Sequence, residues 1–97
     1  MRKFKELKIW QKGFDIALKS YKLTGYFPKE EKYGLASQIT RASVSIPSNI
    51  AEGSSRSSEK DYNRFIEISL GSSFELKTQL LISQALNFGE NNLTGKY

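Results

Sequence analysis

Residues 41–56 decide the fold, and they read RASVSIPSNIAEGSSR. Aliphatic residues recur every three or four positions in this stretch, which predicts a helix. Pro47 stands inside the pattern, where it removes the backbone hydrogen bond to the carbonyl of Ser43 and kinks the helix. The hydroxyls of Ser43 and Ser45 can bond nearby carbonyls and reduce this cost. A helix with such a defect must be held by packing against other helices, in the same chain or in other copies.

A polar row follows the same helix at helical spacing, and it comprises Gln38, Arg41, Ser45, Asn49 and Glu52. One interpretation is a stripe that contacts another subunit, in which Arg41 pairs with a carboxylate and Asn49 fixes the register, as buried polar groups do in coiled coils. The other interpretation is the exposed face of a kinked helix. We favour the subunit contact, because a face turned to solvent rarely needs serine, asparagine and glutamine in place of lysine and glutamate.

Hydrophobic periodicity elsewhere predicts two more helices, so the chain is all-α. We expect helices over about residues 6–24, 29–52 and 58–88. A chain of 97 residues rarely divides into smaller domains. The sequence therefore predicts one helical-bundle domain over residues 1–97, with antiparallel up-down helices.

Capping and turn residues set the predicted boundaries of these helices. Pro28 opens the second helix, with two glutamates, the later one Glu31, in its first turn. Gly53 ends that helix as its cap. Ser58 begins the third helix and forms a capping box with Asp61 three residues on.

The apolar residues are more numerous than three helices need. The first helix presents one predicted core row, made of Leu7, Trp10, Phe14, Ala17, Leu18 and Tyr21. Trp10 and Tyr21 are also rings on which bases can stack, but their period places them in the core. The third helix is apolar on more than one face, which is typical of a helix that lies against another subunit. Residues 71–73, Gly-Ser-Ser, form a notch of small side chains where a neighbour can approach closely.

The composition excludes several classes of protein. The chain has no cysteine and no histidine, which removes disulfides, the usual zinc ligands and the Ser-His and Cys-His nucleophile systems. We therefore expect no catalytic residues, no metal site and no cofactor, and hence no enzyme. The apolar runs are too short to span a membrane, and the basic N-terminus lacks the apolar region of a signal peptide. The expected location is the cytoplasm.

The positive charge is concentrated at one end. The net charge is +5, and residues 1–25 hold seven basic and two acidic residues, whereas the rest of the chain holds eight of each. Such an asymmetry favours a polyanionic partner. The candidate contacts are a lysine row on the first helix, Lys5, Lys8, Lys12, Lys19 and Lys22, with Arg56, Lys60 and Arg64 as an extension. The alternative is a solvated face whose lysines only keep the helix soluble.

Several blocks of the chain resemble a known family. They are Leu7–Lys12 (LKIWQK), Tyr21–Thr24 with Phe27-Pro28, Glu31–Leu35 with Gln38, Ser45–Gly53 (SIPSNIAEG), Arg64-Phe65 and Leu70–Leu76. In this order they resemble the bacterial four helix bundle protein family. That family includes the proteins encoded in 23S rRNA intervening sequences, and it is related to the accessory variability determinant of diversity-generating retroelements.

The resemblance implies an antiparallel bundle that assembles into a ring, typically a homopentamer, without enzymatic activity. It also implies binding to RNA or DNA, or to a reverse transcriptase in the retroelement branch. Members of the family carry a fourth helix after the loop that matches residues 87–97, where this chain stops. The third helix would then expose a long apolar seam.

The sequence therefore predicts a non-catalytic, nucleic-acid-associated scaffold or accessory protein. The lysine row would contact the polyanion, and the second and third helices would contact other subunits. The alternative is a protein-protein interaction module, in which the apolar surface of the third helix docks a partner helix and the lysines only solubilise the chain.

Overall fold

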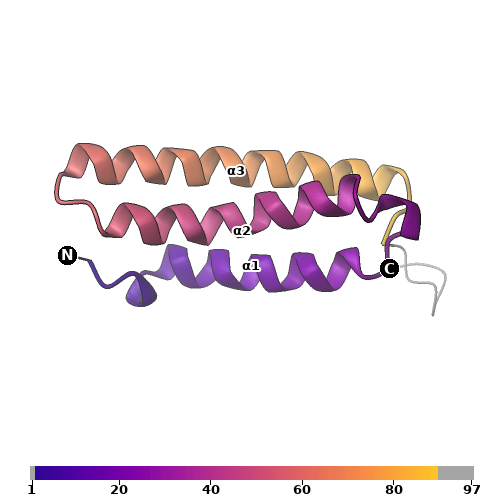
Figure 1. The fold of residues 1–97 in the computed structure, drawn as a ribbon, viewed down its shortest axis with the longest axis horizontal. Helices are drawn as coiled ribbons and strands as arrows, with labels where there is room; N and C mark the ends of the chain where they lie inside the picture. The colour runs from indigo at the N-terminus through magenta and orange to yellow at the C-terminus, as the bar shows by residue number, and fades with distance from the viewer. Residues whose placement is uncertain (1, 90–97) are drawn as a thin grey trace.

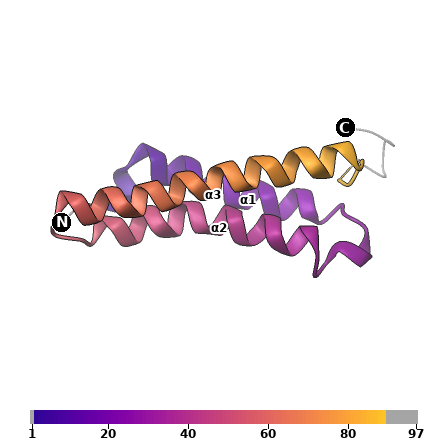
Figure 2. The ribbon, with the colours of Figure 1, turned by 90° about the horizontal axis from the view of Figure 1, so that it is seen from above.

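The computed structural model describes residues 2–89, and in this range it contains helices and no strands. The long helices are α1 (Lys8–Thr24), α2 (Leu35–Ser54) and α3 (Glu59–Ala85), with two short 3-10 helices, η1 (Phe4–Glu6) and η2 (Lys29–Glu31). The predicted all-α class is confirmed. Figure 1 shows α2 returning between α1 and α3, in the direction opposite to both, and Figure 2 shows α2 beside α3 from above. Helix α2 packs against each of the other two long helices.

Small residues bring α1 and α2 together. The buried positions of α1 are Gly13 and Ser20. A Cβ added at Gly13 would lie 3.0 Å from Cγ2 of Ile46 and 3.3 Å from the backbone nitrogen of Pro47. The predicted core row is confirmed at Leu7 and Trp10, which pack against the core. It is wrong at Phe14, Leu18 and Tyr21, which are exposed, because the two helices touch along a ridge of small side chains and the larger ones flank it.

Helix α2 runs without a break through Pro47. As predicted, the Ser43 hydroxyl donates to a nearby carbonyl, that of Thr40, at 2.8 Å. The Ser69 hydroxyl of α3 donates to the carbonyl of Ile46 at 2.9 Å, and this bond is buried. Hydroxyls from both helices thus bond carbonyls that precede the proline, and the bond from Ser69 ties α3 to α2 directly beside it.

The second helix begins at Leu35 rather than at residue 29. The predicted first turn forms the separate 3-10 helix η2, and the chain turns at Gly34 before α2 starts. A Cβ at Gly34 would lie 2.9 Å from Oε1 of Glu31. That carboxylate accepts a hydrogen bond from the backbone N–H of Leu35 at 3.1 Å. Glu31 therefore caps α2 from outside the helix, because the glycine leaves room for its side chain.

Of the two predicted helix ends in the connection between α2 and α3, the start of α3 is confirmed and the end of α2 is wrong. The Ser58 hydroxyl accepts from the N–H of Asp61 at 3.1 Å, which confirms the predicted cap. Gly53 was predicted to end α2, but it lies inside the helix, which continues to Ser54. Its added Cβ would lie 2.7 Å from the Cβ of Phe65. This glycine therefore permits a close approach of α3. Helix α3 ends at Ala85, slightly earlier than predicted, and the predicted terminal loop over residues 90–97 lies outside the described residues.

The core is small, and much apolar surface stays exposed. The buried hydrophobic cluster consists of Phe27, Ile39, Ala42, Ile46, Ile50 and Leu76. The predicted surplus of apolar surface on the third helix is confirmed: the exposed large residues of α3 are Ile68, Leu70, Phe74, Leu81 and Ile82, with Leu86 just after it. The predicted notch of small residues is only partly used. Ser72 contacts α2, whereas a Cβ at Gly71 would meet open space.

Candidate nucleic-acid interface

The lysine row lies on the outward side of α1. Lys8, Lys12, Lys19 and Lys22 are exposed. Helical periodicity places Lys22 opposite the buried Gly13 and Ser20, and it places Lys12 and Lys19 about a quarter turn from them. From Lys8 to Lys22 the row covers about 21 Å, at a rise of about 1.5 Å per residue. Lys5 precedes the row on η1, which is fastened to α1 because the amide of Gln11 donates to the Lys5 carbonyl at 2.9 Å. All five predicted lysines are therefore accessible.

One carboxylate interrupts this row. Lys19 Nζ lies 3.0 Å from a carboxylate oxygen of Asp15, one turn earlier on α1. Both side chains are largely exposed, so the pair is weak and a stronger anion can compete for the lysine. Within residues 2–89, no carboxylate lies within ion-pair distance of Lys8, Lys12 or Lys22.

The predicted extension does not join the lysine row. Lys60 and Arg64 lie near the start of α3, on the side of that helix turned away from Ser69 and hence away from α2. Arg56 lies in the connection before α3, and it forms an ion pair with Glu52 at 3.0 Å. Its guanidinium also lies 4.8 Å from the ring centroid of Phe65. These three cations and the α1 lysines therefore occupy different sides of the chain.

Arg2 joins this second group, although the sequence analysis did not single it out. Its guanidinium lies 3.7 Å from the ring centroid of Tyr62, pairs with the carboxylate of Glu59 and donates to the carbonyl of Arg56 at 3.4 Å. The sequence carries no signal that residue 2 contacts residues 56–62, since these positions are more than fifty residues apart and meet only in the folded chain.

The polar row of α2 is divided between two environments. Its middle faces α3: the hydroxyls of Ser45 and Ser72 are 2.8 Å apart, and the amide of Asn49 donates to Ser45 Oγ at 2.9 Å. The remaining members of the row, Gln38, Arg41 and Glu52, are exposed. In the described part of the chain, Arg41 has no carboxylate within ion-pair distance. A contact with another subunit therefore remains a prediction for the exposed members only.

Two apolar grooves flank the line along which α1 packs on α2. The first, of about 220 Å³, lies between α1 and α3, with Ile9 and Ile16 on one wall, Leu70 on the other and Ile46 of α2 among its lining residues. The second, of about 370 Å³, lies between α1 and α2, and its lining includes Phe14, Leu18 and Val44. The first groove is open because α1 and α3 each pack on α2 and not closely on one another.

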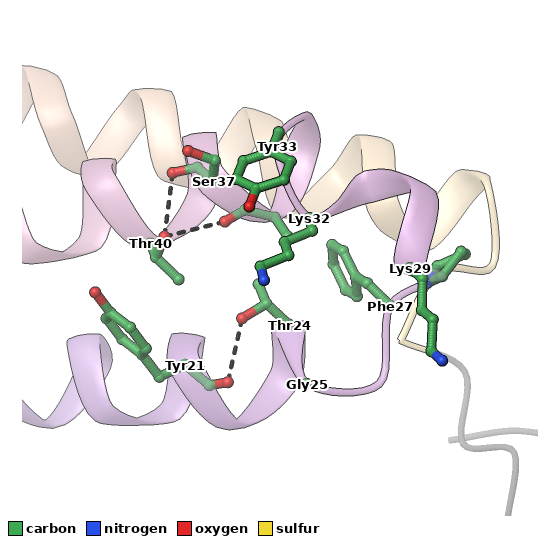
Figure 3. Close-up of a pocket in the computed structure, with 11 residues that line it drawn as sticks. Tyr21, Thr24, Gly25, Phe27, Lys29, Lys32, Tyr33, Ser37 and Thr40 are labelled. Carbon is green, nitrogen blue, oxygen red and sulfur yellow. Dashed lines mark hydrogen bonds between the residues drawn. The ribbon is translucent and has the colours of Figure 1, made fainter.

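A third hollow, of about 500 Å³, lies where the chain passes from α1 to α2, and Figure 3 shows the residues around it. Tyr21 comes from α1, Lys29 from η2, and Lys32 and Tyr33 from the turn that follows. In Figure 3 the side chain of Lys32 extends from beneath Tyr33 toward Thr24, and Tyr21 lies to the left of both. The sequence analysis missed this hollow. Tyr21 was assigned to the core, and the lysines and tyrosine of the turn were not recognised as its neighbours.

Other kinds of site find no support among the described residues. Residues 2–89 contain no cluster of three acidic side chains arranged to hold a metal ion. None of the helices in this range combines the length and the apolar character needed to cross a membrane.

Comparison with known proteins agrees with the blocks of sequence noted above. The family model for the 23S rRNA-intervening sequence protein matches residues 5–96, which is nearly the whole chain. No curated protein matches the chain.

Proposed function

This chain belongs to the 23S rRNA-intervening sequence protein family, and we propose that it is a non-catalytic, self-associating helical protein that binds nucleic acid through the lysine row of α1. The observation that carries the proposal is the location of the charge. The whole positive surplus of the chain belongs to residues 1–25, and the lysines of α1 are exposed on the side away from α2.

A row of lysines on one helix suits the phosphate backbone rather than base edges. Phosphate contacts position a protein on nucleic acid without reading its sequence, and their strength falls steeply with salt. The family name connects its members with an intervening sequence of 23S rRNA, which favours RNA as the partner and the cytoplasm as the location. The absence of histidine and cysteine supports a non-catalytic role.

Self-association completes the proposal, as an antiparallel up-down bundle that forms a closed ring of five subunits, the number that the family resemblance suggests. The support is the distribution of the exposed apolar residues. Phe14 and Leu18 lie in the groove between α1 and α2, whereas Ile68 and Ile82 lie on the opposite side of α3 from Leu70, which lines the α1–α3 groove. Two different apolar surfaces on one chain suit a head-to-tail contact, which closes into a ring. Arg41 and Glu52, at the exposed ends of the polar row, would contribute charge-paired contacts there.

The binding experiment reverses charge on two different faces. In a filter-binding series across ionic strength, the variant Lys8→Glu/Lys12→Glu/Lys22→Glu should bind a single-stranded RNA at least about tenfold more weakly than the unchanged chain at low salt. The matched control, Lys60→Glu/Arg64→Glu/Lys77→Glu, makes the same change of net charge on α3 and should bind far more strongly than the first variant. Equal losses in both variants would show that only net charge matters, and no binding by the unchanged chain would end the proposal.

A second candidate function is a module that docks one amphipathic helix of a partner protein in the α1–α3 groove. The groove favours it, because aliphatic walls on α1 and α3 stand on either side of Ile46, and Lys12 on the rim suits a helix with an acidic flank. Light scattering separates the candidates: self-association predicts a mass several times that of one chain, and a docking module predicts one chain alone. The variant Lys8→Glu/Lys22→Glu, which keeps the rim residue Lys12, would weaken RNA binding strongly in the first case and leave capture of a partner helix intact in the second.

A further inference from the structure

The last lysine of the α1 row is close in sequence to the hollow at the α1–α2 turn. Lys22, the last lysine of the row, is followed within three residues by Gly25, which lines the hollow, and it is preceded by Tyr21, which also lines it. A volume of about 500 Å³ lies within the range of small-molecule sites, about 300–1,000 Å³. A strand that follows the lysine row has to bend around the end of α1 after Lys22 to reach this hollow.

Two tyrosine rings in the lining have little protein cover. Tyr33 is 86% exposed and Tyr21 is 58% exposed, and of the described side chains in the lining, Lys32 has its Nζ 5.4 Å from the ring centroid of Tyr33. Phe27, which is buried and lies 5.7 Å from Phe88 between ring centroids, anchors the lining to the core. Exposed rings beside a hollow are platforms on which a base can stack, and such stacking tolerates any base.

The charge of the lining suits an anion. Lys29 and Lys32 are its ionisable cations, and no carboxylate is among the described residues that line it. The nearby carboxylate of Glu31 is bound to the N–H of Leu35 at the start of α2. The lining also contains the hydroxyl of Ser37, which makes no hydrogen bond with the described residues as a donor and is free to bond a polar group of a ligand.

We propose that this hollow holds one unpaired nucleotide of a strand whose backbone follows the lysine row of α1. The base stacks on the rings of Tyr21 and Tyr33, and the phosphate lies at Lys29 and Lys32. The proposal rests on the function proposed above, and it adds a preference: a fully paired duplex has no free base to offer, so unpaired nucleic acid binds more strongly.

Fluorescence anisotropy with two RNA hairpins tests this preference. One hairpin has a blunt end, and the other carries a short unpaired overhang on the same stem. The unchanged protein should bind the overhang hairpin about tenfold more tightly, the size expected for stacking of one base. The variant Tyr21→Ala/Tyr33→Ala should lose this preference and keep its affinity for the blunt hairpin, whereas Tyr21→Phe/Tyr33→Phe should retain the preference.

Control variants show whether a lost preference comes from the two tyrosines of the hollow, and not from misfolding or from the loss of any exposed tyrosine. Tyr26 is an exposed tyrosine of the same turn that does not line the hollow, so Tyr26→Ala should change nothing. Both tyrosines of the site are exposed, so their variants should show the unchanged helical circular dichroism. If Tyr21→Ala/Tyr33→Ala still prefers the overhang hairpin, the proposal that a base binds in this hollow is wrong. The proposed role of the lysine row would be unaffected.

The triple α1 reversal distinguishes the two proposals. It should weaken both hairpins by the same factor and preserve the preference for the overhang. Failure of the unchanged protein to bind either hairpin would overturn the function itself together with the pocket. Adenosine monophosphate serves as the free-nucleotide probe: if it binds as tightly as the overhang hairpin, the hollow is a site for free nucleotides and the strand is excluded.

Discussion

The two turns between the long helices carry similar residue types and use them differently. The α2–α3 turn comprises residues 55–58 and includes Arg56, and Arg2 from the N-terminus lies against it. Each of these two arginines has a carboxylate partner and an aromatic ring of the same chain beside it. At the α1–α2 turn, residues 25–34, Lys29 and Lys32 line an open hollow that contains no carboxylate among its described lining. The first turn is closed by its own contacts, and the second is left open.

We infer from this difference that countercharges, and not the number of basic residues, decide which turn can bind an anion. An arginine that is already paired and stacked must give up those contacts before it meets a phosphate. Lys29 and Lys32 have no carboxylate partner among the described residues, and Lys32 has only a contact of its ammonium with the Tyr33 ring, at 5.4 Å from the centroid, to give up. We therefore expect the α2–α3 turn to contribute mainly to stability and the α1–α2 turn mainly to binding.

Of the changes proposed here, Gly53→Ala should reduce the free energy of unfolding most, because it disrupts the packing at the α2–α3 turn. The new Cβ would lie 2.7 Å from the Cβ of Phe65, so α3 must shift. We expect a loss of about 2 kcal/mol in the free energy of unfolding, measured by urea denaturation. Gly71→Ala is the matched control, because nothing lies within 4 Å of its added Cβ, and it should stabilise α3 by about 0.5–1 kcal/mol. Equal effects of the two changes would contradict the close approach at Gly53.

Ser58→Ala, at the same turn, should cause the next largest loss in the free energy of unfolding. Its hydroxyl caps α3 by accepting from the N–H of Asp61, and loss of such a cap costs about 1 kcal/mol. Ser57→Ala removes a neighbouring exposed hydroxyl that does not cap the helix, and it should leave the midpoint of urea unfolding unchanged. A similar loss in both variants would mean that the cap contributes nothing specific.

The helices themselves could be predicted from sequence, because their apolar periods are long and regular. The side of α1 that packs was predicted wrongly for a physical reason. Periodicity identifies the apolar side of a helix, but the contact with α2 is made by Gly13 and Ser20, which carry no hydrophobic signal. The start of α2 was also wrong, because Pro28 and the glutamates after it are typical of a helix N-terminus, and only the turn at Gly34 separates them from α2.

The candidate site was predictable only in part. The lysines of α1 share one helical row, so their common exposure follows from the sequence alone. The hollow beside them joins Tyr21 to Lys32 and Tyr33, and this neighbourhood depends on how the intervening turn folds. The same limit hid Arg2, which meets Tyr62 only through the packing of the N-terminus on α3.

Lys32→Gln tests the open turn directly. It removes one of the two cations of the hollow, and we expect the affinity for single-stranded RNA at low salt to fall about three- to fivefold by anisotropy. Arg56→Gln makes the same change of charge at the closed turn and should alter this affinity less than twofold, by about the error of such a measurement. If Arg56→Gln weakens binding as much as Lys32→Gln does, the two turns are equivalent as anion contacts.

Glu52→Gln/Glu59→Gln should cause the smallest change in affinity for RNA. It removes the carboxylates of the α2–α3 turn and so makes that turn more like the α1–α2 turn. The change frees Arg2 and Arg56 from their carboxylate partners. We expect affinity for RNA to rise about two- to threefold, with a steeper dependence on salt. Glu67→Gln/Glu75→Gln is the control, because these exposed carboxylates of α3 form no ion pair within the described residues and change the net charge equally. An equal rise in the control would assign the effect to net charge alone.

The most direct test of the whole account is a backbone NMR titration of the protein with a short single-stranded RNA at moderate salt. The account predicts that chemical-shift changes gather along residues 8–22 and around residues 29–33, and that residues 52–64 remain nearly unchanged. Changes confined to residues 52–64, or absent from the whole chain, would contradict it.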